Sequence, residues 1–181
     1  MTHTIRAVTA ADLPALFSYL GEQLIENGRK GNPLFQPVPR TDDPSLPLAI
    51  RSRFTNGLAA AVGEPGWRRA WIAVDGRDAI AGHVDLRARP EPGSAHRAML
   101  GMGVHPGSRR LGLGMRLIDA AAAWARENGF EWIDLEVLSV NTPAIALYQR
   151  SGFAMIGEFA DMYRIDGERH AYTLMSLHIQ P

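Results

Sequence analysis

Two arginines and two glycines lie close together just before an apolar stretch in the second half of the chain. Arg109 and Arg110 are followed by Gly112 and Gly114, and the apolar residues from Leu113 onward have helical spacing. A strand, a glycine turn and a helix start together present unpaired backbone N–H groups to an anion. Glycines let a phosphate approach the backbone, and arginines add charge-assisted hydrogen bonds. We therefore expect a diphosphate site; the alternative is an ordinary left-handed turn with two solvated arginines.

The composition of the whole chain restricts what this turn could serve. The chain has 181 residues, 46% of them hydrophobic, with 19 basic and 19 acidic residues. This suits a single domain over residues 1–181 with no overall attraction to nucleic acid or to an anionic membrane. The absence of cysteine excludes disulfides, thiolate metal sites and a cysteine acyl-enzyme. No run has the roughly 18 apolar residues of a membrane span, and the first residues do not resemble a signal peptide, so we expect a cytoplasmic protein. The six histidines show no spacing typical of a metal site.

The periodicity of the apolar residues predicts the elements that position the turn. Asp12 is expected to cap the first helix and Gly28 to end it. The pattern predicts a mixed α/β domain in the order β-α-α-β-β-β-α-β-α-β-β. The expected helices are 10–28, 48–63, 113–129 and 142–150; the expected strands are 3–9, 96–104 and 131–138, with hairpins at 68–89 and 153–177.

The glycine turn matches neither the P-loop nor the dinucleotide-binding glycine pattern. It resembles instead the acetyl-CoA motif of the GNAT superfamily of N-acetyltransferases, and the later stretch LEVLSVNTPAIALYQRSGF resembles the second signature of that superfamily. The specific motifs lie within residues 97–153. The resemblance implies a mostly antiparallel sheet flanked by helices, acetyl-CoA as co-substrate, the diphosphate at the turn and the pantetheine arm along residues 102–104. The implied cofactor-binding residues are Met102, Gly103, Val104, Arg109, Arg110, Leu111, Gly112, Leu113, Gly114, Met115 and Asn141.

The same resemblance assigns the proton transfers that amine acetylation needs. Tyr148 matches the tyrosine that donates a proton to the departing thiolate; a packed aromatic side chain is the alternative. Glu136 lies in the middle of a predicted strand, where a carboxylate is costly unless it is paired or used, and it precedes Tyr148 by 12 residues. Its context resembles acetyltransferases that modify ribosomal-protein N-termini, in which the corresponding glutamate is the base. A structural carboxylate is the alternative for Glu136.

Three further residues have two interpretations each. His96 begins the strand that leads to the turn, and a histidine needs little tuning to act as a base at neutral pH, but a lone histidine is more often structural. Asp85 is a further candidate for the base, or it could instead attract a cationic amine. Asn141, which matches an asparagine that bonds the coenzyme A arm, could also cap the helix that follows it.

We expect an N-acetyltransferase that moves an acetyl group from acetyl-CoA directly to a primary amine, without a covalent enzyme intermediate and without a metal. The acceptor is a small molecule or a protein N-terminus, and the proline-rich stretch 29–47, which holds five of the 12 prolines, is expected to select it. The sequence leaves open whether the protein forms a homodimer. The alternatives are a non-catalytic acyl-CoA-binding sensor and an interaction domain whose glycine turn is only structural.

Overall fold

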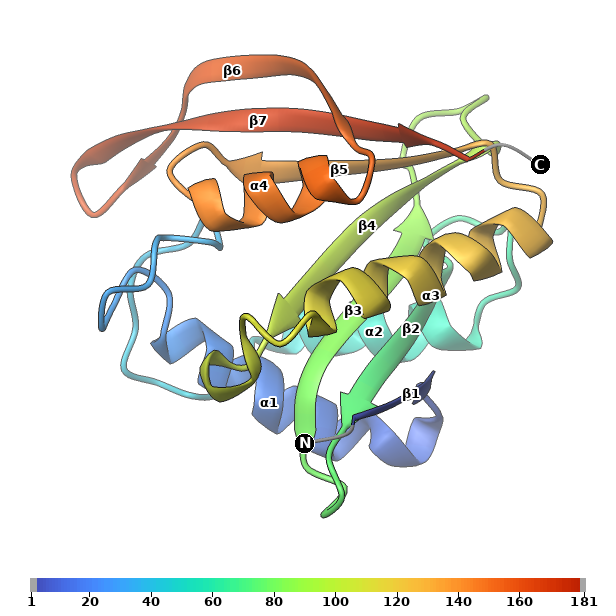
Figure 1. The fold of residues 1–181 in the computed structure, drawn as a ribbon, viewed down its shortest axis with the longest axis horizontal. Coiled ribbons are helices and arrows are strands. Elements are labelled where there is room, and N and C mark those ends of the chain that lie inside the picture. Colours follow the sequence, from blue (N-terminus) through green and yellow to red (C-terminus); the bar gives the residue numbers. More distant parts are fainter. Residues whose placement is uncertain (1–2, 180–181) are drawn as a thin grey trace.

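The fold is built around one mixed sheet. The computed structural model describes residues 3–179, and across them seven strands run in the order β1-β2-β3-β4-β5-β7-β6 (Figure 1). Neighbouring strands are antiparallel, except that β4 and β5 are parallel. The strands are β1 Thr4–Ala7, β2 Arg68–Val74, β3 Ile80–Ala88, β4 Arg97–Val104, β5 Trp132–Leu138, β6 Ala154–Ile165 and β7 Glu168–His178.

Helices cover both faces of the sheet (Figure 1). Helices α3 (Leu113–Glu127) and α4 (Thr142–Arg150) lie on one face, which we call the α3 face; α1 (Leu13–Ile25) and α2 (Leu48–Ala59) lie on the other, the α1 face. The larger core cluster joins the apolar stripe of α3 to strands β2 to β5, and a smaller one joins α1 and α2 to β2. Alternate residues of β2 point to opposite faces, so Trp71 and Ala73 belong to the larger cluster and Ile72 and Val74 to the smaller one. Within residues 3–179, none of the helices has the length and apolar character of a membrane span.

Strands β4 and β5 separate after a short parallel pairing. They pair only from Arg97 to Met99 on β4, the last pair being Met99 with Asp134. Beyond that point β4 stays paired with β3, and β5 stays paired with β7. The two strands therefore diverge toward their C-terminal ends (Figure 1), and we call the space between residues 100–104 and 135–138 the gap.

The loop 29–47 extends from the end of β4 to the β6–β7 hairpin. Arg109, directly after β4, donates a hydrogen bond to the Asn32 side chain. Farther along the loop, Arg40 forms an ion pair with Asp166 in the hairpin turn at 2.8 Å. Leu34 packs in a small buried cluster with residues of β5 and β6. The loop is thus attached on both sides of the gap.

The element order predicted from the sequence is confirmed, with differences at both ends of the first helix and at the end of the second, which stops at Ala59 and not at residue 63. Thr9 is the N-cap of a short 3-10 turn that precedes α1, and the Asp12 carboxylate closes a capping box by accepting the Thr9 backbone N–H at 2.8 Å. Asp12 occupies the N-cap position of α1, as predicted, but within residues 3–179 its side chain makes no capping hydrogen bond to that helix. The helix ends at Ile25, because Gly28, with a φ of 68°, already belongs to the loop.

Candidate functional site

The glycine turn between β4 and α3 has the geometry expected of an anion site. Gly112 is the N-cap of α3, in the left-handed region with φ 74° and ψ 0°. A Cβ atom at Gly112 would have no neighbour within 4 Å, so its outer side faces open space. The N–H groups of the first helical turn, from Leu113 to Met115, have no acceptor within the helix, and this turn carries no acidic residue. The positive end of the helix is therefore open to a negative ligand.

The two arginines of the turn have different surroundings. Arg109 donates from Nε to the Val104 carbonyl oxygen at 3.0 Å and from Nη1 to the Asn32 side chain. Arg110 is exposed, with a φ of 61°, and makes no ion pair within residues 3–179. Arg109 thus fastens the loop to the end of β4, while Arg110 remains available to an anion.

Gly114 lies where α3 approaches α4. A Cβ atom there would be 2.8 Å from Leu147 Cδ2 and 3.6 Å from Met102 Cε. The missing side chain lets the start of α3, the end of β4 and α4 meet at one place. Gly114 therefore has a packing function in addition to any role beside a phosphate.

The free edge of β4 forms one wall of the gap. Residues Met102, Gly103 and Val104 pair with β3 on one side and, within residues 3–179, have no strand partner on the other. The side chains of Met102 and Val104 pack against the main core on the α3 face. Unpaired backbone groups on a strand edge can bond an extended ligand.

Tyr148 and Asn141 come from the segment that follows β5. The Tyr148 ring is 8% exposed and packs against Phe153, and burial raises the pKa of its hydroxyl to about 12. Within residues 3–179 this hydroxyl makes no hydrogen bond, yet it is not sealed from solvent as the unpaired hydroxyl of Tyr19 is. Asn141 is the N-cap of α4, but its side chain makes no capping hydrogen bond to any described residue. Both polar groups are therefore free to bind a ligand.

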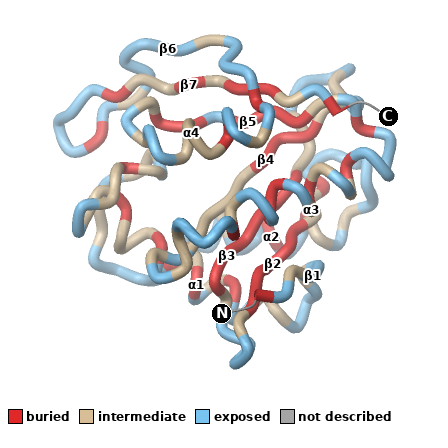
Figure 2. Tube along the Cα trace, viewed as in Figure 1, coloured by how far each residue is buried: buried red, intermediate tan, exposed pale blue. Residues whose placement is uncertain are grey.

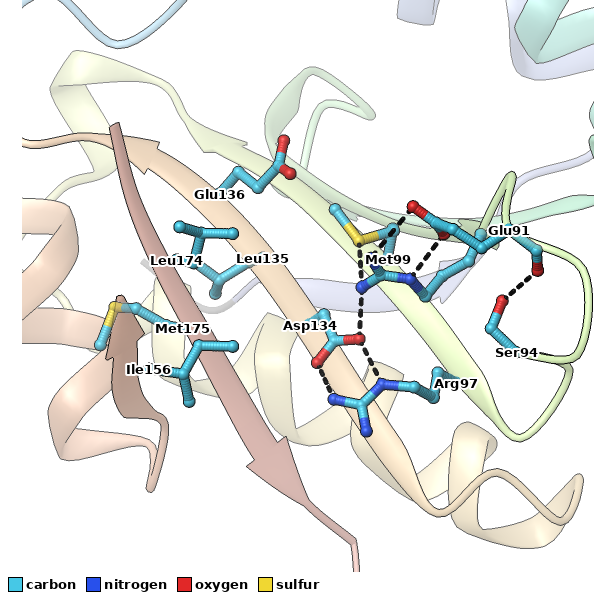
Figure 3. A pocket seen from close by; sticks show the side chains of 11 residues that line it. Glu91, Ser94, Arg97, Met99, Asp134, Leu135, Glu136, Ile156, Leu174 and Met175 are labelled. Carbon is cyan, nitrogen blue, oxygen red and sulfur yellow. Dashed lines mark hydrogen bonds and ion pairs between the residues drawn. The ribbon is translucent and has the colours of Figure 1, made fainter. Parts of the chain in front are cut away.

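Two carboxylates of β5 point to the α1 face and differ in their partners (Figure 3). Asp134 is buried and accepts hydrogen bonds from Arg97 Nε at 2.7 Å, from Arg89 Nη1 at 2.7 Å and from Ser176. Burial alone would raise the pKa of Asp134, but these hydrogen bonds outweigh it and lower the pKa. Glu136 is exposed and has no hydrogen bond or ion pair within the described residues. Asp134 is structural, and Glu136 is the unpaired carboxylate.

Glu136 lines a cavity of about 370 Å³ on the α1 face (Figure 3). Met99, Ile156 and Leu174 contribute apolar walls, and the Asp134 network lies at the other end. Glu136 pairs in register with Leu174 on β7 and lies just beyond the last pair that joins β5 to β4. The cavity therefore opens beside the start of the gap.

The structure places neither His96 nor Asp85, the two other candidates for the base, at the gap as an unpaired group. His96 is exposed and precedes β4, whereas the glycine turn follows it, so a strand of about 26 Å separates them. Asp85 is buried on β3 and forms ion pairs with Arg68 and Arg87. Neither arrangement offers an unpaired base at the gap.

Some polar groups near the gap could not be recognised as neighbours of the site from any local sequence pattern. Tyr19 of α1 and His83 of β3 lie edge to face, with ring centroids 5.5 Å apart, and Tyr19 Oη and His83 Nδ1 are buried without a partner. A Cβ at Gly103 would lie 3.4 Å from His83 Nδ1 and 3.5 Å from Tyr19 Oη. This proximity follows from the pairing of β3 with β4 and from the contact of Tyr19 on α1 with His83. The described residues contain no group of three or more His, Asp or Glu side chains placed to hold a metal ion.

Comparison with known proteins identifies a family. Residues 40–153, more than half of the chain, match the model of the Acetyltransferase (GNAT) family. The chain is 33% identical over 124 residues to streptothricin acetyltransferase from Streptomyces lavendulae, a match that covers 67% of this chain and 65% of that protein. The chain therefore spans slightly less than two thirds of this relative.

Solved structures share the fold. An acetyltransferase of the GNAT family from Streptococcus pneumoniae has a TM-score of 0.81 and 24% identity, covering 98% of this chain and 100% of that one. A GNAT superfamily phosphinothricin acetyltransferase from Sinorhizobium meliloti, solved in complex with AcCoA, has a TM-score of 0.78 and 19% identity, covering 99% and 89%. The mixed, mostly antiparallel sheet with flanking helices predicted from the sequence is thereby confirmed.

Proposed function

Because the chain belongs to the acetyltransferase (GNAT) family, we propose that it transfers an acetyl group from acetyl-CoA directly to a primary amine. The observation that carries this proposal is the gap between β4 and β5. It has an open helix N-terminus at one end and an unpaired carboxylate, Glu136, beside its start. Membership of the family points to acetyl-CoA as the co-substrate, and the gap is a place where the thioester and the amine could meet.

Three features of the chain fit acetyl-CoA. The open space at Gly112 and the first-turn N–H groups suit the diphosphate, with Arg110, Leu111, Leu113, Gly114 and Met115 around it. The free edge of β4 at Met102, Gly103 and Val104 suits the amide groups of the pantetheine arm. The unbonded side chain of Asn141 suits the same arm. In this arrangement Arg109 supports the site by holding β4 and the loop together.

Glu136 is proposed as the general base. At neutral pH, removing a proton from a lysine-like amine costs about 4 to 5 kcal/mol, so a proton acceptor near the amine lowers the barrier. Within the described part of the chain Glu136 forms no ion pair, and it lies in an open cavity, so it can accept that proton directly or through one water. The free amine then forms the new N–C bond with the acetyl carbon while the C–S bond breaks.

Tyr148 is proposed as the general acid. The departing thiolate needs a proton, and a buried phenol whose pKa is raised to about 12 remains protonated at neutral pH. Its hydroxyl has no other hydrogen bond within the described residues. Because α4 lies along β5 next to the gap (Figure 1), Tyr148 approaches the thioester from the α3 face, opposite Glu136.

The test is acetyl-CoA turnover across a panel of acceptors, with each product identified by mass spectrometry. The panel holds small amines, amino acids, peptides with free N-termini and, because a relative is named streptothricin acetyltransferase, streptothricin. Amine-dependent release of coenzyme A with formation of an acetylated amine supports the proposal. Stabilisation by acetyl-CoA without any turnover would favour an acyl-CoA sensor instead, and no stabilisation would favour an interaction domain.

A further inference from the structure

Among the residues that the structure describes, the cavity beside Glu136 offers no unpaired cation to an acceptor. Its arginines are engaged: Arg89 contacts Glu91 at 3.0 Å and Asp134 at 2.7 Å, and Arg97 contacts Asp134 at 2.5 Å. Figure 3 shows this network at the end of the cavity away from Glu136. Glu136 is therefore the lining charge without a partner among the described residues.

Arg87, whose strand partner Met99 lines the cavity, is also engaged. Arg87 of β3 pairs in register with Met99 of β4, and its guanidinium lies 3.4 Å from the Asp85 carboxylate, which Arg68 also contacts. An acceptor carboxylate placed next to the amine would thus lie near Glu136 without a free cation to receive it. Placing like charges side by side in a partly desolvated site is costly.

Apolar surface continues from Glu136 toward the edge of the sheet. Leu174 is the register partner of both Glu136 and Gly157. Gly157 carries no side chain, so Leu174 stays uncovered on that side. Ile156 and Phe159 lie on either side of Gly157 on the edge strand β6, and they are 61% and 51% exposed. β6 is largely exposed along its length (Figure 2).

We propose that the acceptor carries its primary amine on an apolar body and has no carboxylate next to that amine. The ammonium group lies at Glu136, and the apolar body covers Leu174, Ile156 and Phe159. The unpaired carboxylate complements the charge of the amine, and burial of the exposed apolar side chains contributes binding energy. This inference rests on the proposed acetyl transfer and specifies its acceptor.

Three amines test the inference. 2-Phenylethylamine has both features, phenylalanine adds a carboxylate to the same skeleton, and ethylamine lacks the apolar body. We expect kcat/KM for 2-phenylethylamine to exceed the values for phenylalanine and ethylamine by about tenfold or more, since a site without the matching polar partner discriminates at least this strongly. Equal use of phenylalanine and 2-phenylethylamine would overturn the inference but leave the proposed function intact. No acetylation of any amine would contradict the proposed function, and this inference with it.

Variants of the edge strand locate the apolar contact. Ile156→Ser and Phe159→Ser should each raise KM for 2-phenylethylamine about threefold to tenfold, with little change for ethylamine. Met155→Ser is the matched control: Met155 is 52% exposed on the same strand, but its register partner Met175 belongs to the core of the α3 face. Met155→Ser should leave KM unchanged for all three amines. Unchanged kinetics in Ile156→Ser and Phe159→Ser, or an equal effect of Met155→Ser, would contradict the proposed contact.

Discussion

Gly114 leaves the space that Leu147 fills, since a Cβ atom on Gly114 would lie 2.8 Å from Leu147 Cδ2. Two residues earlier, Gly112 faces open space and instead needs its glycine for a φ of 74°. The two glycines of one turn thus serve different purposes. Gly112 shapes the open helix start, and Gly114 brings α3 against α4, the helix that carries Tyr148.

Gly112→Val should abolish stabilisation by acetyl-CoA. A ligand that binds only the folded protein raises the Tm by mass action, and a valine side chain would occupy the proposed path of the diphosphate. Gly129→Val is the control, because Gly129 has a φ of 77° and equally open surroundings but lies at the other end of α3. Both variants should lose about 1 to 2 kcal/mol of unfolding free energy through backbone strain. A folded Gly112→Val protein with an undiminished ligand-induced Tm rise would disprove the diphosphate site.

Tyr148→Phe should lower kcat by about 10- to 1000-fold, the loss expected when a general acid is removed. The affinity for acetyl-CoA should barely change, because the buried ring remains in place. Steady-state kinetics and ligand titration measure the two effects separately. Tyr163→Phe, the same chemical change on β6, should leave kcat unaltered. Turnover of Tyr148→Phe at the wild-type rate would make Tyr148 a packing residue only.

His83 should make the protein sensitive to mild acid. Burial lowers the pKa of His83 to about 4, while the nearby charges of Asp85 and Arg68 act in opposite directions. The unfolded chain binds this proton near pH 6.5, so the contribution of His83 to stability is complete above that pH and is lost as the pH falls toward 4. The loss amounts to about 3 kcal/mol at most.

Urea unfolding at pH 7.5 and 4.5 measures this contribution. His83→Gln should lose less unfolding free energy between the two pH values than the wild type does. His96→Gln, at an exposed histidine, should behave like the wild type. If His83→Gln loses as much stability on acidification as the wild type, His83 is not the acid-sensitive group.

Asn27 should hold the loop 29–47 in place. Its buried amide accepts the backbone N–H groups of Phe35 at 2.7 Å and Gln36 at 2.9 Å and donates to the Gln36 carbonyl at 3.0 Å. Asn27→Ala leaves these backbone groups unpaired, which should cost about 2 to 3 kcal/mol and speed proteolytic cleavage within the loop. Asn128→Ala, which removes one exposed hydrogen bond, is the control. Equal protease resistance of Asn27→Ala and wild type would show that other contacts hold the loop.

The sequence predicted the glycine turn and its helix because their determinants are local. A left-handed glycine, an apolar stripe and a terminal Gly129 mark α3 within one stretch of chain. The separation of β4 from β5 after Met99 and Asp134 was not predictable in this way. It depends on where two distant strands stop pairing, and no residue in either strand marks that point.

The ion-pair and hydrogen-bond partners of the charged residues also could not be predicted from local sequence patterns. Asp134 and Glu136 look equivalent in the sequence, as two carboxylates on one face of a strand. Arg89 and Arg97, 45 and 37 residues away from Asp134, pair with it and leave Glu136 free. Arg109 similarly bonds a residue 77 positions away, so the sequence could not show that it fastens the loop.

The pH dependence of kcat/KM in wild type and Glu136→Gln tests the central claim, that an unpaired carboxylate at the gap receives the proton of the amine. In the wild type, kcat/KM for the acceptor should level off through the neutral range, because the carboxylate takes the proton there. In Glu136→Gln it should be lower and rise about tenfold per pH unit toward the pKa of the amine, since only free amine reacts. Thermal stability should change little, because Glu136 has no partner among the described residues. A profile identical to that of the wild type, together with a large fall in Tm, would contradict the account and make Glu136 structural.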